Sequence, residues 1–199
     1  MSKISVGKVI TNALLLSAFG AAMVTGCGMI CNEKDNSATM VEVTVPEYDF
    51  DAPRHVEYAV PLGNTSFKSY MDWGCITNTG SDQYKLQQKC VTDDNGLRRF
   101  GDDYVIALGS YYSTHIGDKF LITLSNGESF TAVVGDLKAD RHTDSMHRYT
   151  PMSDGGKNIV EFIVDTDELD SKARRMGDIS YINGFSGNVE KVEKLYDIE

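Results

Sequence analysis

The stretch from Tyr104 to Asp165 constrains the fold of this chain more than any other part of the sequence. Within it, short runs rich in β-branched and aromatic residues are separated by turn-forming residues; the runs span 104–108, 119–124, 128–134 and 159–164. Runs of this length and composition are typical of β-strands. Ser125-Asn126-Gly127 joins the second run to the third, and Asn-Gly favours a type I′ hairpin turn. The sequence therefore predicts a mainly β domain.

Two of these strands lead into an aspartate, Asp136 after FTAVVG and Asp165 after VEFIV. An acid just past an apolar strand tends to lie at the rim of a sheet or barrel, where the backbone turns. The two carboxyls are therefore candidates for general acid/base chemistry. They are equally candidates for a structural role, as acceptors of hydrogen bonds from loop amides. Glu161 lies within the last run, and alternation does not say whether it faces the interior or solvent.

The rest of the chain adds weaker elements. We expect strands at 41–45 and 55–60, a loop at 64–79, a turn at 93–96, and one or two strands between 178 and 195. Trp73 in the expected loop is a packing anchor or a platform for a sugar ring. We expect one short helix at 81–90, with Ser81 as its N-cap. A second is expected from 167 to 176, with acids at its start, bases near its end and Gly177 terminating it.

Composition excludes some partners. The 199 residues suffice for one domain with appendages, and 41% hydrophobic content is ample for a core. The formal net charge is -10. A surface this acidic would repel the phosphates of nucleic acids and the head groups of anionic lipids. We therefore expect no nucleic-acid partner.

The N-terminus has the layout of a secretory signal. Lys3 and Lys8 precede an apolar run at 9–24, and small residues follow. Val24-Thr25-Gly26-Cys27 resembles a bacterial lipobox, in which cleavage leaves the cysteine lipid-modified. The alternatives are an uncleaved membrane anchor, an ordinary cleaved signal or a buried helix. All but the last predict an extracytoplasmic protein, secreted or membrane-anchored, with Cys27 as the lipidation site.

The other cysteines leave the redox state open. Cys75 and Cys90 flank a short segment and are able to pair in an oxidising compartment. Cys31 would then be a free thiol or form an intermolecular disulfide. Reduced thiols throughout are the alternative. The spacing does not fit a Cys-x-x-Cys zinc or redox site.

The order of elements across residues 96–196 resembles a known barrel. Three pieces of the sequence are similar to pieces of the double-psi β-barrel of rare lipoprotein A, expansins and the 3D domain of membrane-bound lytic transglycosylases. They are YVIALGSYYSTHIGDKFLITLSNG, FTAVVGD, and VEFIVDTDEL followed by ARRMG. The chain also resembles small secreted or phage-borne Firmicutes proteins of that barrel type. It departs from the family pattern in the Leu137-Lys138-Ala139 that follows the first aspartate, and in a longer insert.

The resemblance implies a fold and an activity. The fold would be a small six-stranded double-psi-like β-barrel with one or two short helices. The activity would be glycan cleavage on peptidoglycan, with Asp136 or Asp165 as general acid/base. We expect Tyr111, Tyr112, Lys138 and Glu161 to contact the substrate. No cofactor is expected.

The insert after the first aspartate carries a weak metal-site candidate. Asp140, His142, Asp144 and His147 are residue types able to converge on a divalent ion, which would change the chemistry to hydrolysis by activated water. Solvated loop residues are the alternative, and our prediction is no metal.

The sequence thus predicts four segments: a signal peptide or anchor at 1–26, a flexible linker at 27–40, an N-terminal extension at 41–95 packed on the barrel, and the barrel at 96–199. Two functions stay open. One is a lytic transglycosylase-like enzyme on the cell wall. The other is a non-catalytic module that binds envelope glycan or another protein, including a phage-borne structural protein.

Overall fold

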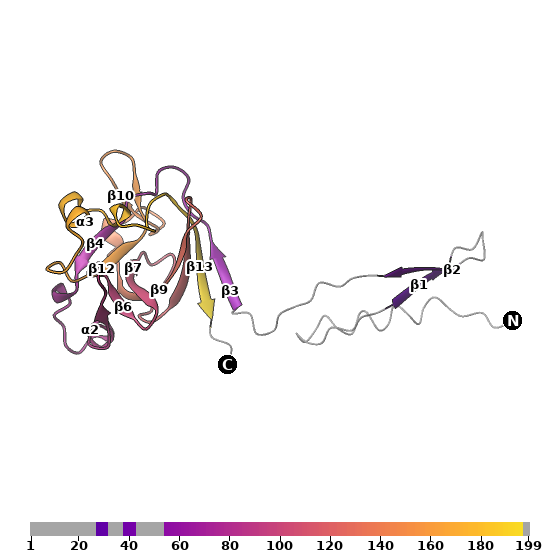
Figure 1. Cartoon of the computed structure of the whole chain (residues 1–199), viewed down its shortest axis with the longest axis horizontal. Helices are drawn as coiled ribbons and strands as arrows, with labels where there is room; N and C mark the ends of the chain where they lie inside the picture. The colour runs from indigo at the N-terminus through magenta and orange to yellow at the C-terminus, as the bar shows by residue number, and fades with distance from the viewer. Residues whose placement is uncertain (1–26, 32–37, 43–53, 197–199) are drawn as a thin grey trace. The chain divides into compact units, whose positions relative to one another are not determined.

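The structure, a computed structural model, describes residues 27–31, 38–42 and 54–196. The chain divides into two compact units, residues 1–52 and residues 53–199. In the first unit, β1 (Cys27–Cys31) pairs antiparallel with β2 (Ala38–Glu42) (Figure 1). The segment expected as a flexible linker therefore contains paired strands. The signal expected at 1–26 lies outside the described residues, as does most of the strand expected at 41–45.

The second unit is built on one mixed sheet, which confirms the mainly β prediction. Its main path runs β3-β13-β8-β9-β7-β12-β4, and β5 and β6 extend it from β7. The strand bounds are β3 (Arg54–Tyr58), β4 (Ser69–Asp72), β5 (Val91–Thr92), β6 (Arg98–Phe100), β7 (Asp103–Leu108), β8 (Lys119–Leu124), β9 (Ser129–Leu137), β12 (Glu161–Val164) and β13 (Val189–Tyr196). A separate ribbon pairs β10 (Thr150–Pro151) with β11 (Lys157–Asn158).

Most neighbouring strands are antiparallel, but two pairs are parallel: β7 with β9, and β12 with β4. The expectation of a loop at 64–79 was wrong, because β4 lies there. Residues 69–72 lack an alternating apolar pattern, and β12 supplies the hydrogen bonds that make them a strand. β3 and β4, which belong to the segment expected as an N-terminal extension, stand at the two ends of the same sheet path.

The sheet has apolar side chains on both faces. One face covers the main core, in which Phe130, Phe162 and Phe185 pack on one another and on the partly buried Tyr104, with ring centroids 5.1–6.0 Å apart. The other face carries a smaller cluster of Val105, Ala107, Val133 and Ile163. Leu86 of α2 (Asp82–Gln87) packs on this second cluster, together with Met71 and Trp73. Both faces of β7 are thus buried, as expected for a strand that reads YVIAL.

The predicted ends of the two helices are confirmed, except for the start of the second helix. Ser81 caps α2 by accepting a hydrogen bond from the Tyr84 amide, as predicted. The second helix, α3 (Ser171–Met176), begins later than expected, because Asp170 caps it through the amides of Lys172 and Ala173. Gly177 ends α3 at φ 69°, as predicted.

The β8–β9 hairpin is confirmed, but its turn type was predicted wrongly. Gly127 has φ 87°, whereas Asn126 is not among the residues with positive φ. A type I′ turn needs positive φ at both positions.

Three short 3₁₀ segments complete the described elements: η1 (Trp73–Cys75), η2 (Asp140–His142) and η3 (Ile179–Tyr181). In the described part of the chain, no helix has both the length and the apolar character needed to cross a membrane.

Candidate functional site

Asp136 lies within β9 and not past its end, so its expected position at a strand terminus was wrong. A register shift between β7 and β9 skips Gly135 and places Asp136 opposite Ala107. Ala107 is also opposite Glu161 of β12, and Glu161 is opposite Ser69 of β4. Residues opposite one another in neighbouring strands point to the same face. Two carboxylates therefore share one face of the sheet, with only the methyl side chain of Ala107 between them.

This face is the one that α2 partly covers, and the cover shapes the electrostatics of Asp136. Burial raises the pKa of Asp136; hydrogen bonds with the Leu137 backbone and the Gln83 side chain act in the opposite direction, and the nearby Glu161 carboxylate raises the pKa further. Burial disfavours the charged form of a carboxyl, and a second negative charge adds to that effect. Asp136 is therefore a half-buried acid that holds its proton more tightly than a free aspartate.

Lys138 and Glu161 belong to the same polar cluster. Lys138 is 7% exposed, and its ammonium donates to the backbone carbonyl of Asn158 at 3.2 Å. Burial lowers the pKa of Lys138 to about 8, while the charge of Glu161 acts to raise it. Glu161 Oε1 is 3.0 Å from Ser69 Oγ, which donates to it. The structure thus brings three of the predicted site residues together: Asp136, Lys138 and Glu161.

Asp165 lies directly after β12, as predicted, but it does not meet Asp136. It follows Glu161 by four residues, which is about 13 Å along the chain at about 3.3 Å per residue. Asp136 lies two strands, about 10 Å, to the side of Glu161, so the backbones of Asp165 and Asp136 are about 16 Å apart. Its carboxylate accepts hydrogen bonds from Trp73 Nε1 at 3.3 Å and from the Asp167 amide at 3.1 Å. Catalytic carboxylates on one glycosidic bond lie about 5–9.5 Å apart. Asp165 and Asp136 are therefore not such a pair, and Asp165 holds the turn after β12 and the indole of Trp73.

The two tyrosines expected to contact substrate lie on the core side. Tyr112 is 1% exposed, so the expectation that its ring is exposed was wrong. Among the described residues its hydroxyl has no hydrogen-bond partner, and burial raises the pKa of Tyr112 far above its usual value. Tyr111 is half-buried, with its ring centroid 5.1 Å from that of Tyr112 and 5.7 Å from that of Tyr58. In this conformation Tyr112 offers no surface on which a sugar ring could stack.

Sequence reasoning missed three polar members of the cluster: Ser69, Gln83 and Asn158. Ser69 was hidden because β4 was read as a loop. Gln83 was placed on a helix, but nothing indicated which strand that helix covers. Asn158 comes just before a run of apolar residues. A polar residue next to such a run is often buried and hydrogen-bonded, and this is the signal that could have pointed to Asn158.

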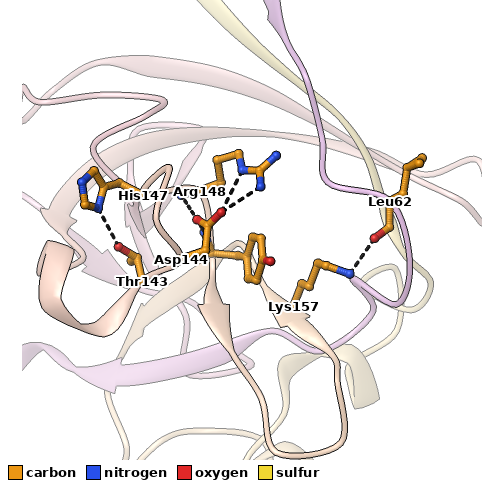
Figure 2. Close-up of polar contacts among 7 residues, drawn as sticks. Leu62, Thr143, Asp144, His147, Arg148 and Lys157 are labelled. Carbon is orange, nitrogen blue, oxygen red and sulfur yellow. Dashed lines mark hydrogen bonds and ion pairs between the residues drawn. The ribbon is translucent and has the colours of Figure 1, made fainter.

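The insert does not gather a metal site. Asp144 accepts hydrogen bonds from Arg148 Nε at 3.0 Å and Nη2 at 2.8 Å, and from the amide of the same residue at 2.6 Å (Figure 2). His147 Nδ1 is 3.1 Å from Thr143 Oγ1 and 3.6 Å from Asp140 Oδ1, and His142 Nε2 accepts from Arg141. Among residues 54–196 and the two described N-terminal strands, no group of three or more His, Cys, Asp or Glu side chains has the geometry to hold a metal ion.

The cysteines of the second unit are free thiols, so the Cys75–Cys90 disulfide is not formed. Cys75 is exposed, whereas Cys90 packs against the second apolar cluster. The thiol of Cys90 donates to the Leu86 carbonyl at 3.2 Å, and burial raises its pKa to about 11. Cys27, the expected lipidation site, is the first residue of β1.

Comparisons with known proteins give no family: no family model matches the chain, and no curated protein matches it.

Proposed function

We propose that residues 53–199 act on a glycan of the bacterial cell wall, peptidoglycan, with Asp136 as general acid/base. One observation carries the proposal: the half-buried Asp136 shares a sheet face with Glu161, and its pKa is raised. General acid catalysis needs a carboxyl that still holds a proton near the working pH. A raised pKa favours that state.

The chemistry requires one such acid. In a lytic transglycosylase-like cleavage, Asp136 donates its proton to the glycosidic oxygen, and a hydroxyl of the same sugar attacks in place of water. That hydroxyl then returns a proton to Asp136. Glu161 lies two strands away, about 10 Å between backbones, where its charge favours the protonated form of Asp136. Asp165 takes no part in this scheme.

The proposed fold within the mixed sheet is the double-psi β-barrel. The two parallel pairs, β7–β9 and β12–β4, in an otherwise antiparallel sheet support this proposal. So does the hairpin that brings β9 back beside β7. We further propose, from the N-terminal sequence, an exported protein that is tethered to a membrane through Cys27.

A second candidate is a non-catalytic envelope or glycan-binding module. It is favoured by the hydrogen bonds that both aspartates accept, since Asp165 binds Trp73 and Asp136 interacts with Gln83. An acid engaged in this way serves to position neighbours or to bind sugar hydroxyls.

Digestion of purified peptidoglycan by residues 41–199 tests both candidates. Soluble fragments are read by mass, and the variants are Asp136→Asn and, as the matched control, Asp165→Asn. Anhydro-sugar ends that disappear in Asp136→Asn and persist in Asp165→Asn support the enzyme. Co-sedimentation of the folded protein with the wall, without release of fragments, supports the binding module. If the folded protein neither releases fragments nor binds the wall, both candidates are refuted.

A further inference from the structure

The polar cluster contains a contact that the proposed activity does not use. Lys138, directly after β9, and Asn158, the last residue of β11, are 7% and 5% exposed, and they meet inside the protein. Burying an amine is costly unless it is paired with a charge. Among the described residues, no carboxylate lies within ion-pair distance of Lys138, although Glu161 is near enough to affect its charge. A buried amine placed against an amide calls for a chemical explanation.

The orientation of the Asn158 amide follows from its hydrogen bonds. When Nδ2 donates to the Val160 carbonyl at 2.8 Å, Oδ1 accepts from Lys138 Nζ at 3.2 Å and from Ser69 Oγ at 2.6 Å. Donors directed at a carbonyl oxygen stabilise the negative charge that develops there when a nucleophile attacks the carbonyl carbon. The Ser69 hydroxyl has one proton, so it does this for Asn158 when it turns from the Glu161 carboxylate to Asn158 Oδ1.

The nucleophile and a proton carrier are present in the same cluster. With a pKa of about 8, Lys138 is a neutral amine in about a tenth of the molecules at pH 7, and the neutral amine is the nucleophile. Ser69 Oγ is also 3.0 Å from Glu161 Oε1. Glu161 can therefore exchange protons with the reacting groups through this hydroxyl.

We propose that Lys138 and Asn158 join in an intramolecular isopeptide bond, with Glu161 as the proton carrier. Lys138 Nζ attacks Asn158 Cγ, and the new C–N bond replaces the bond from Cγ to Nδ2. Nζ gives up one proton, and Nδ2 gains one and leaves as ammonia; Glu161 carries the proton through the Ser69 hydroxyl. No oxidant or other reactant is needed. This proposal goes beyond the proposed function and does not depend on it.

The bond would fasten the base of the insert. Lys138 and Asn158 bracket residues 139–157, which include η2 and the β10–β11 ribbon. A covalent link at this point restricts the unfolded chain as a disulfide does, but reductants do not open it.

Peptide mass analysis of the purified full chain tests the proposal. The expected intact mass is about 17 Da below that of the sequence after the same N-terminal processing, for loss of one ammonia. Trypsin should fail to cut after Lys138 and should release a branched peptide that joins residues 120–141 to residues 158–172. Glu161→Gln should lose the branched peptide while remaining folded, and Lys138→Arg should lose it as well. The matched control, Lys157→Arg, changes the neighbouring lysine and should keep it.

Two results would overturn the proposal. One is a folded wild-type chain of full mass whose tryptic peptides end at Lys138 and begin at Asn158 without a link. The other is a gain of about 1 Da at Asn158, which is hydrolysis of the amide to a carboxylate. Both are read from the wild-type protein, so a variant that fails to fold does not affect the outcome.

Discussion

Replacing Asp144 by alanine tests how much the ordered insert depends on one buried acid. The Asp144 carboxylate accepts three hydrogen bonds from Arg148 (Figure 2). It accepts one more from the Tyr149 amide at 3.3 Å. The side chains of Asp144 and Arg148 are 9% and 23% exposed. These bonds close the turn that leads into β10, so their loss should release the turn.

The expected cost follows from this burial. Breaking a buried ion pair by removing one partner costs about 3–5 kcal/mol, because the remaining charge is left without a partner. Since the Arg148 guanidinium keeps some contact with water, we expect the lower end of this range. A loss of about 3 kcal/mol in the free energy of unfolding corresponds to a fall of about 6–12 °C in Tm for a domain of this size.

Thermal and urea unfolding of residues 53–199 measure this loss. The matched control is Asp82→Ala, which removes an i,i+3 ion pair to Lys85 whose side chains are 79% and 61% exposed. Exposed pairs contribute about 0–1 kcal/mol. If Asp144→Ala costs no more than Asp82→Ala, burial does not govern the Asp144 interaction and the reasoning fails.

The same interaction predicts a pH dependence. Burial acts to raise the pKa of Asp144, but hydrogen bonds from Arg148 and Tyr149 outweigh it and lower the pKa below its usual value. A lowered folded-state pKa gives stability that is present above the unfolded value of about 3.9 and is lost as the pH falls through the folded-state pKa. The difference between wild type and Asp144→Ala should therefore shrink below about pH 4. A difference that stays constant to acid pH would contradict this assignment.

Three further predictions concern other parts of the domain. Because the folded-state pKa of Asp136 is raised, its ionised form destabilises the fold at neutral pH. Asp136→Asn should therefore raise the urea midpoint of unfolding at pH 7 but not below about pH 4. A lower midpoint at pH 7 would show a structural role. Gly109→Ala places a Cβ 2.0 Å from the His147 carbonyl oxygen and should lower the free energy of unfolding by about 1–3 kcal/mol. An unchanged Tm would mean that the insert moves away from the new Cβ without cost. In thiol labelling at pH 8, exposed Cys75 should react faster than half-buried Cys90, whose pKa is raised to about 11. Equal rates would contradict the partial burial of Cys90.

Several elements of the fold could be predicted because their causes are local. The runs at 104–108 and 119–124 became β7 and β8 with nearly the expected bounds, since their alternation and β-branched residues fit a pleated surface. Ser81 and Gly177 were recognised as helix ends because capping depends only on nearby backbone groups. β4 could not be predicted, because its ordering comes from β12, about ninety residues further along the chain.

The candidate site was predictable only in its residue types. Asp136, Lys138 and Glu161 were all named from the sequence, but the sequence did not indicate that Asp136 lies nearer to Glu161 than to Asp165. The sequence marked Asp165 because it follows an apolar strand, and the structure uses it to bind Trp73. Tyr112 was expected to contact the substrate, but its ring packs into the core.

The sequence by itself determined that this chain forms β-strands, where most of them lie, and which acidic residues lie in or directly after them. These features depend on side-chain periodicity and on turn chemistry within a few residues. Only the tertiary structure decided that Ser69, Glu161, Ala107 and Asp136 form one row across four strands. Register between strands far apart in the chain is set by packing of both sheet faces and by the shift at Gly135, and a shift of one residue turns every side chain to the opposite face.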